Sequence, residues 1–175
     1  MRIVLTGGWG YGNLGDDAIL DSTIEMIKES YPGCTIDVLT YNLSDSLLYK
    51  DRKSIFLHKS VHSYVDFNTS ELSFKRLNMD YPLLKKVLMK IKRYAVDSSV
   101  WCNVSNFERN SKPVKEIIQA ADLFVVSGGG YFNEKWIGSV MAHLVEMKMA
   151  IDSEVPFIVT GPTIGTFSNQ KIKKW

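Results

Sequence analysis

Apolar runs alternate with amphipathic segments at both ends of the chain. The run Arg2–Thr6 is short, β-branched and bounded by glycine, which predicts a strand buried on both faces of a parallel sheet. Apolar residues then recur with a roughly helical spacing from Ala18 to Tyr31, where Pro32 and Gly33 end the pattern. The N-terminal segment therefore predicts a strand, a glycine-rich loop and a helix.

The same alternation continues along the chain. We expect further strands at Thr35–Thr40, Leu123–Ser127 and Phe157–Thr160, the last two as buried runs, and helices at 114–121 and 137–151. A third strand is expected within 54–67, where the apolar fragments are 55–57 and 61–65. This order predicts an α/β fold with a Rossmann-like, doubly wound parallel sheet.

The stretch from Ser70 to Ser111 departs from this pattern and is basic and aromatic, which we interpret as an insertion. Its most regular part, 80–96, has the spacing of an amphipathic helix rich in lysine. Such a helix can lie on an anionic membrane surface, or it can pack on the domain by its apolar stripe. Packing on the domain is the commoner arrangement, and we favour it.

Composition narrows the class of protein. The chain has 175 residues, of which 45% are hydrophobic, so it can bury the core of one domain of ordinary size. A net charge of only +2 disfavours nucleic acid as a partner. Cys34 and Cys102 match no metal-binding spacing, and we see no signal peptide or membrane-spanning run. We therefore expect a cytoplasmic location, with peripheral membrane contact as an option for 80–96.

Glycine clusters follow three of the apolar strands directly. Because parallel strands end at the same edge of a sheet, the clusters predict a ligand site there, although glycines after strands also serve tight turns. The predicted binding residues are Gly12, Asn13, Gly15, Asp17, Ser127, Gly128, Gly129, Gly130, Asn133, Gly161 and Gly165, with Glu134 behind them.

The first cluster contains a G-x-G-x-x-G pattern at Gly10, Gly12 and Gly15, which is weak evidence for a dinucleotide site. No acid follows the second strand to hold a ribose. Asp16 and Asp17 also place negative charge where a pyrophosphate would bind. Carboxylates at this position suit hydroxyl groups, which they can hydrogen-bond or deprotonate.

Asp16 has two compatible interpretations. It is an N-cap or first-turn acid favoured by the helix dipole, or a carboxylate that orients or deprotonates a sugar hydroxyl. Asp17 fits the dipole role better, and Asn13 fits capping better. His58 and His62 have no third ligand nearby in sequence, so we expect no metal site, and we interpret His143 as a packed or surface residue.

Three segments together resemble the polysaccharide pyruvyl transferase family. The first is the pattern G-x-x-N-x-G-D-[DE]-A, met here by Asn13, Gly15, Asp16, Asp17 and Ala18 with Ile19 after it. The second is ADLFVVSGGGYF at Ala121–Phe132, and the third is TGPTIGTF at Thr160–Phe167. The segment from about Ser44 to Ser111 carries nothing specific to that family.

The resemblance implies a two-domain fold like that of GT-B glycosyltransferases. It also implies transfer of a pyruvyl group from phosphoenolpyruvate to two hydroxyls of a sugar in a surface polysaccharide. The acceptor, a sugar or lipid-linked oligosaccharide, is expected between the domains. By analogy, Asp16 contacts the acceptor hydroxyls or acts as base. The segments Ser127–Gly130 and Gly161–Gly165 are expected to line the site. No cofactor beyond the donor substrate is expected.

Members of the family are usually about twice as long as this chain, and their donor-binding basic residues belong largely to a second domain. We therefore expect residues 1–175 to be the N-terminal, acceptor-side half, weak or inactive alone. Two alternatives remain. The chain is the N-terminal half of a nucleotide-sugar glycosyltransferase of GT-B type, or it is a non-catalytic α/β binding module.

Overall fold

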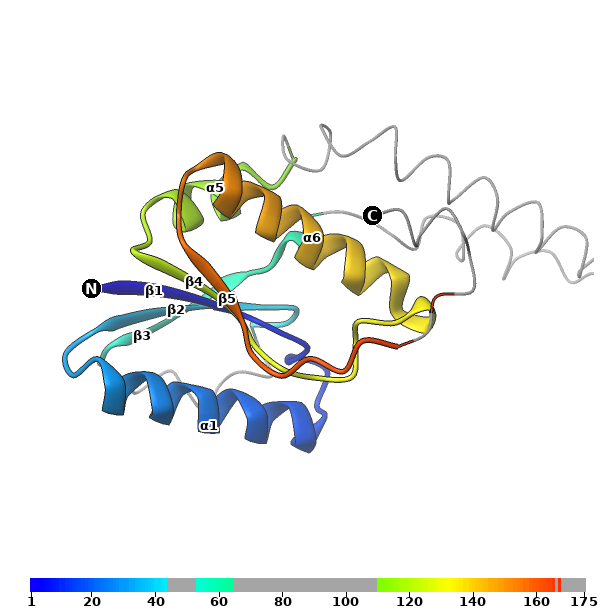
Figure 1. The fold of residues 1–175 in the computed structure, drawn as a ribbon, viewed down its shortest axis with the longest axis horizontal. Helices are drawn as coiled ribbons and strands as arrows, with labels where there is room; N and C mark the ends of the chain where they lie inside the picture. Colours follow the sequence, from blue (N-terminus) through cyan, green and yellow to red (C-terminus); the bar gives the residue numbers. More distant parts are fainter. Residues whose placement is uncertain (44–52, 65–109, 166, 168–175) are drawn as a thin grey trace, which may run out of the picture.

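The computed structural model describes residues 1–43, 53–64, 110–165 and 167, which contain one parallel sheet (Figure 1). Its five strands have the spatial order β3-β2-β1-β4-β5. They are β1 (Arg2–Thr6), β2 (Thr35–Thr40), β3 (Ile55–Lys59), β4 (Leu123–Val126) and β5 (Phe157–Val159). The central strand β1 pairs with β2 on one side and β4 on the other, which confirms the predicted Rossmann-like α/β fold.

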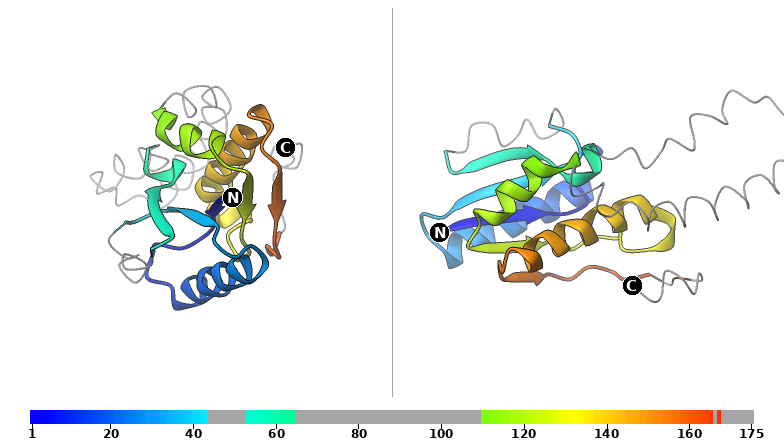
Figure 2. Two further views of the ribbon diagram at one scale, coloured as in Figure 1. Left: turned by 90° about the vertical axis from the view of Figure 1, so that its left-hand side faces the viewer. Right: turned by 90° about the horizontal axis from the view of Figure 1, so that it is seen from above.

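Helices cover both faces of the sheet. The helix α1 (Leu14–Ser30) lies on one face, and α5 (Lys112–Gln119) and α6 (Ile137–Asp152) lie on the other (Figure 2). Two short 3-10 helices, η2 (Val61–Ser63) and η3 (Glu134–Trp136), follow β3 and precede α6.

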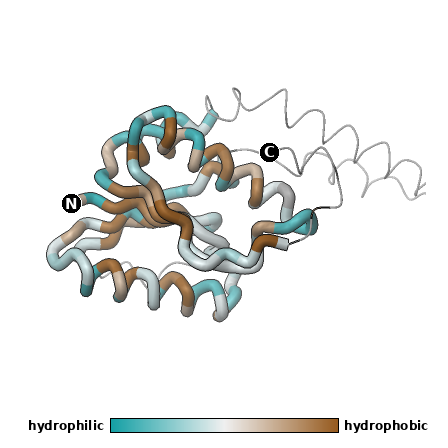
Figure 3. The backbone as a smooth tube through the Cα atoms, in the orientation of Figure 1, coloured by the Kyte–Doolittle hydropathy of each residue, from teal (hydrophilic) through white to brown (hydrophobic). Residues whose placement is uncertain are grey.

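Two separate apolar clusters fill the spaces between the sheet and its helices, and the apolar positions concentrate along the strands (Figure 3). Successive strand residues point to opposite faces. Ile3 and Leu5 of β1 therefore belong to the cluster under α1, whereas Val4 belongs to the cluster under α5 and α6. Burial on both faces explains why the β1 sequence is a continuous apolar run.

The helix α1 begins at Leu14 with Asn13 as its cap, which places Asp16 and Asp17 in its first turn. One predicted element was wrong. The second apolar fragment after β3 begins not a strand but the 3-10 helix η2, of which Val61 is the buried residue.

The prediction that Phe157–Thr160 is a buried strand was also wrong. The exposed fractions of Phe157, Ile158 and Val159 are 36%, 48% and 41%. The strand β5 forms the edge of the sheet and pairs only with β4 among the described strands. An apolar run specifies a strand but not its neighbours, so the pattern alone overestimates burial at an edge.

The predicted amphipathic helix at 80–96 and most of the predicted insertion lie outside the described residues, so both interpretations of that helix stay predictions. Of the helices in the described parts of the chain, none has the length and apolar character needed to cross a membrane.

A buried carboxylate links the first three strands. Oδ2 of Asp37, on β2, accepts a hydrogen bond from Nε of Arg2 at 2.6 Å, and Oδ1 lies 2.6 Å from Nε2 of His58. Burial alone would raise the pKa of Asp37, but the hydrogen bonds and charges of His58 and Arg2 outweigh it, and the pKa is lowered. His58 is thus engaged with a carboxylate, and no group of three potential metal ligands occurs among the described residues.

We predict that Asp37→Asn lowers the free energy of unfolding by about 1.5–3 kcal/mol at pH 7, the range for hydrogen bonds to charged groups. Folding lowers the pKa of Asp37. The stability that its carboxylate contributes is therefore complete above the ordinary carboxyl pKa of about 4, and it is lost as the pH falls through the lowered pKa of the folded state. Urea unfolding at pH 7 and at about pH 3 measures both effects.

The control is Asp152→Asn, which removes a partly exposed pair with Lys148 and should change stability by less than about 1 kcal/mol. If the difference in free energy of unfolding between Asp37→Asn and the parent protein stays constant on acidification, the stabilising role of the Asp37 carboxylate is contradicted.

Candidate functional site

The three glycine-rich loops meet at the carboxyl edge of the sheet, as predicted. We call residues 7–13 the first loop, 127–133 the second and 160–165 the third. The third is held to the second by hydrogen bonds from Thr163 N to Gly129 O at 3.0 Å and from Gly165 N to Phe132 O at 2.8 Å. The Tyr131 ring of the second loop packs so closely on Gly8 of the first that a Cβ there would lie 2.7 Å from it.

Asn13 is the N-cap of α1 and also holds Asp16. Its backbone is extended, with φ −90° and ψ 106°, and its Oδ1 accepts a hydrogen bond from Gly15 N at 3.1 Å. Its Nδ2 donates to Oδ2 of Asp16 at 2.8 Å. The favoured capping interpretation of Asn13 is therefore confirmed, and Asp16 is a first-turn acid rather than the cap.

The Asp16 carboxylate reaches from α1 to the second loop. A Cβ built on Gly129 would lie 3.8 Å from its Oδ1. Partial burial raises the pKa of Asp16, and the hydrogen bond from Asn13 only partly offsets this. A half-buried carboxylate with a raised pKa is a better proton acceptor than an exposed one. Asp17 follows in the first turn, and its backbone N–H donates to Asn13 O at 3.0 Å.

The predicted glycines have different surroundings. At Gly128 a Cβ would lie 2.8 Å from Thr160 O, and at Gly165 it would lie 2.6 Å from the Asn133 side chain, so these two glycines serve the contact between the second and third loops. Gly12 and Gly161 have φ values of +70° and +58° with open space around them. The remaining predicted glycines, Gly15, Gly129 and Gly130, lie at the start of α1 and in the second loop.

Ser127 and Asn133 have partners within the protein. The buried Ser127 hydroxyl lies 3.1 Å from Thr23 Oγ1 on α1, and its carbonyl accepts a hydrogen bond from the Tyr131 hydroxyl. Asn133 donates to Gly130 O at 2.6 Å and accepts from Lys135 N at 2.9 Å. These contacts shape the second loop, and ligand binding by Ser127 and Asn133 stays a prediction.

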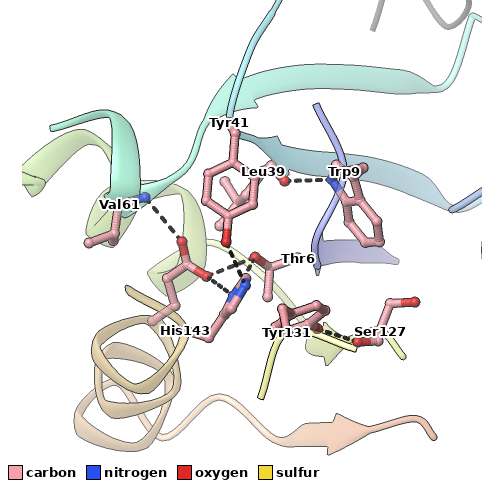
Figure 4. A network of polar contacts seen from close by, with 9 residues as sticks. Thr6, Trp9, Leu39, Tyr41, Val61, Ser127, Tyr131 and His143 are labelled. Atoms are coloured by element: carbon pink, nitrogen blue, oxygen red, sulfur yellow. Dashed lines mark hydrogen bonds and ion pairs between the residues drawn. The ribbon is translucent and has the colours of Figure 1, made fainter. Parts of the chain in front are cut away.

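A buried polar network behind the loops was not predicted (Figure 4). Oε2 of Glu146 accepts hydrogen bonds from Thr6 Oγ1 at 2.7 Å and from Nδ1 of His143 at 3.1 Å, and Oε1 accepts from Val61 N at 3.0 Å. Nε2 of His143 lies 3.0 Å from the Tyr41 hydroxyl. His143, interpreted from the sequence as a packed or surface residue, is fully buried.

The protons of this network can be assigned. Burial above all, together with the charge of Glu146, raises the pKa of Tyr41, while a hydrogen bond with Ser139 lowers it less. The Tyr41 hydroxyl therefore stays protonated and can donate to Nε2 of His143. Nδ1 of the same ring then carries the proton that it shares with Glu146. The sequence signal for this network was a histidine and an acid at i and i+3 in the mostly apolar part of α6 before Lys148.

Tyr131 lies between Asp16 and this network. Its ring centroid is 4.6 Å from that of His143. Burial raises the pKa of Tyr131, and the charges of Glu146 and Asp16 raise it further. Tyr131 thus lies close to both carboxylates and packs on the buried histidine.

The three loops offer polar groups but no cation. The three loops contain carboxamides, hydroxyls and glycines but no Arg, Lys or His, and the carboxylate of Asp16 adds negative charge beside them. A phosphorylated ligand needs cationic partners, which must come from outside these loops.

The comparison with protein families gave a match over most of the chain. The family model described as polysaccharide pyruvyl transferase matches residues 13–174, which is most of the chain. The match begins at Asn13, the residue that caps α1 and binds Asp16. No curated protein matches the sequence.

We predict that Asn13→Ala costs about 0.5–2 kcal/mol of stability, because α1 loses its cap. The same change should raise the pKa of Asp16 further, since the hydrogen bond that lowers it is removed. Asn13→Asp is the matched variant: it keeps a capping oxygen, and so stability, but its charge also raises the pKa of Asp16. Carboxyl-carbon NMR titration and urea unfolding separate the two effects. An unchanged Asp16 pKa in Asn13→Ala would rule out this coupling.

We also predict that Glu146→Gln lowers the free energy of unfolding by about 1–3 kcal/mol. In either orientation, the amide nitrogen would face a donor, Val61 N or Nδ1 of His143, and that hydrogen bond would be lost. Urea unfolding measures this loss. Glu116→Gln, at an exposed position on α5, is the control and should stay within about 0.5 kcal/mol of the parent. Equal stabilities of the two variants would show that the network contributes nothing.

Proposed function

Because this chain belongs to the polysaccharide pyruvyl transferase family, we propose that it is the acceptor-side half of a pyruvyl transferase. The family is one of transferases. In the proposed reaction, two hydroxyl oxygens of a sugar bond to the enol carbon of phosphoenolpyruvate and phosphate leaves. One hydroxyl proton reaches the methylene carbon, which becomes a methyl group, and the other leaves with phosphate. The product is a pyruvate ketal on a surface polysaccharide.

The observation that carries this proposal is the position of Asp16. Its carboxylate is held by Asn13 at the start of α1 and lies against the second loop, and partial burial raises its pKa. An acceptor hydroxyl is a weak nucleophile until a base orients it and removes its proton. Asp16 is the described residue at this edge whose charge and position suit that task.

The remaining roles follow from the loops. We assign the predicted substrate-binding positions of the three loops to the acceptor, chiefly through backbone groups, since Ser127 and Asn133 already have internal partners. We assign the phosphate and carboxylate of phosphoenolpyruvate to basic residues outside the three loops, in a second domain of the GT-B type. A sugar linked to a lipid carrier would place the reaction in the cytoplasm at the inner face of the membrane.

We predict that Asp16→Asn and Asp16→Ala lower kcat for ketal formation by about 10²–10⁴-fold, the usual contribution of a general base. The assay detects pyruvate ketal and phosphate formed from phosphoenolpyruvate and an oligosaccharide acceptor, with the 175-residue chain alone and with a second domain supplied. The acid limb of kcat/KM should lie above the ordinary carboxyl pKa, because burial raises the pKa of Asp16.

Glu25→Gln, an exposed position on the same helix, is the control and should leave kcat unchanged. Full activity of Asp16→Ala would rule out the catalytic role of Asp16 and leave only its role as a first-turn acid of α1. Binding of a nucleotide sugar without ketal formation would instead favour a glycosyltransferase half.

A further inference from the structure

A cluster of three aromatic rings joins the first loop to the segments that follow β2 and β3. Tyr11 comes from the first loop, Tyr41 follows β2 and His62 belongs to η2 after β3. The ring centroids of Tyr11 and Tyr41 are 4.7 Å apart with planes at 31°. The His62 ring stands at 90° to that of Tyr41, with centroids 4.8 Å apart. We call these three residues the aromatic platform.

The inner part of the platform is fixed by the buried network. The Tyr41 hydroxyl is bonded to His143, and Glu146 accepts a hydrogen bond from Val61 N, the first residue of η2. Ser63 Oγ donates to Tyr41 O at 3.2 Å, which ties η2 to the segment after β2. The rings of Tyr41 and His62 are therefore oriented before any ligand arrives, which lowers the entropic cost of binding to them.

The outer part is exposed to solvent. The exposed fraction of Tyr11 is 61%, and it stands between Gly10 and Gly12, whose φ values are +95° and +70°. The Tyr11 ring thus contacts the Tyr41 ring and is otherwise directed to solvent rather than into the core. An aromatic ring that is stacked by one neighbour and otherwise exposed at a ligand-binding edge offers an apolar surface to a ligand.

The charge around the platform limits the ligand class. The first loop, residues 41–43 and residues 60–64 contain no Lys or Arg. A nucleotide would need cations for its phosphates, whereas a neutral sugar needs none. One face of a pyranose presents C–H groups, which pack on the negative face of an aromatic ring.

We propose that the aromatic platform is a saccharide subsite, in which Tyr11 stacks on a pyranose ring next to the one whose hydroxyls meet Asp16. This proposal rests on the proposed function, because it assumes an oligosaccharide acceptor. It makes Tyr11 a residue that sets acceptor length, since a single sugar at Asp16 leaves the platform empty.

The test is saturation-transfer NMR with the 175-residue chain and maltose, cellobiose and lactose as probes. Selective saturation of aromatic protons should transfer to the C–H protons of at least one disaccharide. Tyr11→Ala should raise the apparent Kd about 3–10-fold, the loss expected for one aromatic contact, and Tyr11→Phe should restore it. Tyr31→Ala, at another exposed tyrosine beyond the end of α1, is the control and should bind like the parent.

Three outcomes would overturn the proposal: no transfer to any of the disaccharides, equal binding by Tyr11→Ala and the parent, or Tyr11-dependent transfer to uridine but to no sugar. Asp16→Ala separates this proposal from the proposed function. If the disaccharide still stacks on Tyr11 in Asp16→Ala, and no ketal formation is detected with the parent protein, the saccharide subsite is supported and the proposed reaction is not.

Discussion

The carboxyl edge of this protein depends on one buried carboxylate. Placing Glu146 in the interior is costly unless its oxygens accept good hydrogen bonds. The donors come from three separate places in the fold: Thr6 at the end of β1, the backbone of η2, and His143 on α6 itself. The hydrogen bonds of this one group tie the end of β1, the start of η2 and α6 to one another. The first loop follows β1 directly, so this link also supports the position of that loop.

Two groups of side chains lie at this edge. Asp16 projects from the start of α1 toward the second loop, held by the cap residue Asn13. The aromatic platform joins the first loop to the segments that follow β2 and β3. The buried network contacts the platform through Tyr41, and Tyr131 packs on His143 of that network. A carboxylate and an aromatic surface at one edge match the oligosaccharide acceptor that we propose.

The sequence predicted the fold better than it predicted the roles of single residues. Strands such as Arg2–Thr6 are buried on both faces, so their composition alone identifies them, and glycines directly after strands locate the edge. The inward orientation of Ser127 could not be predicted, because its partner Thr23 lies on a different element. The exposure of β5 and the hydrogen bonds of Glu146 likewise depend on which segments become neighbours in the fold. Local periodicity in the sequence does not indicate those neighbours.

The position of β1 in the middle of the sheet has a consequence for biosynthesis. Arg2 N donates to Asp122 across a separation of 120 residues, and β1 pairs with β4 beside it. During translation β1, β2 and β3 emerge early, but the second edge of β1 has no strand to pair with until β4 leaves the ribosome. Non-local pairing of this kind slows folding, and an unpaired apolar strand invites association with other chains. The central strand is therefore open to wrong pairing until residues 123–126 have been synthesised.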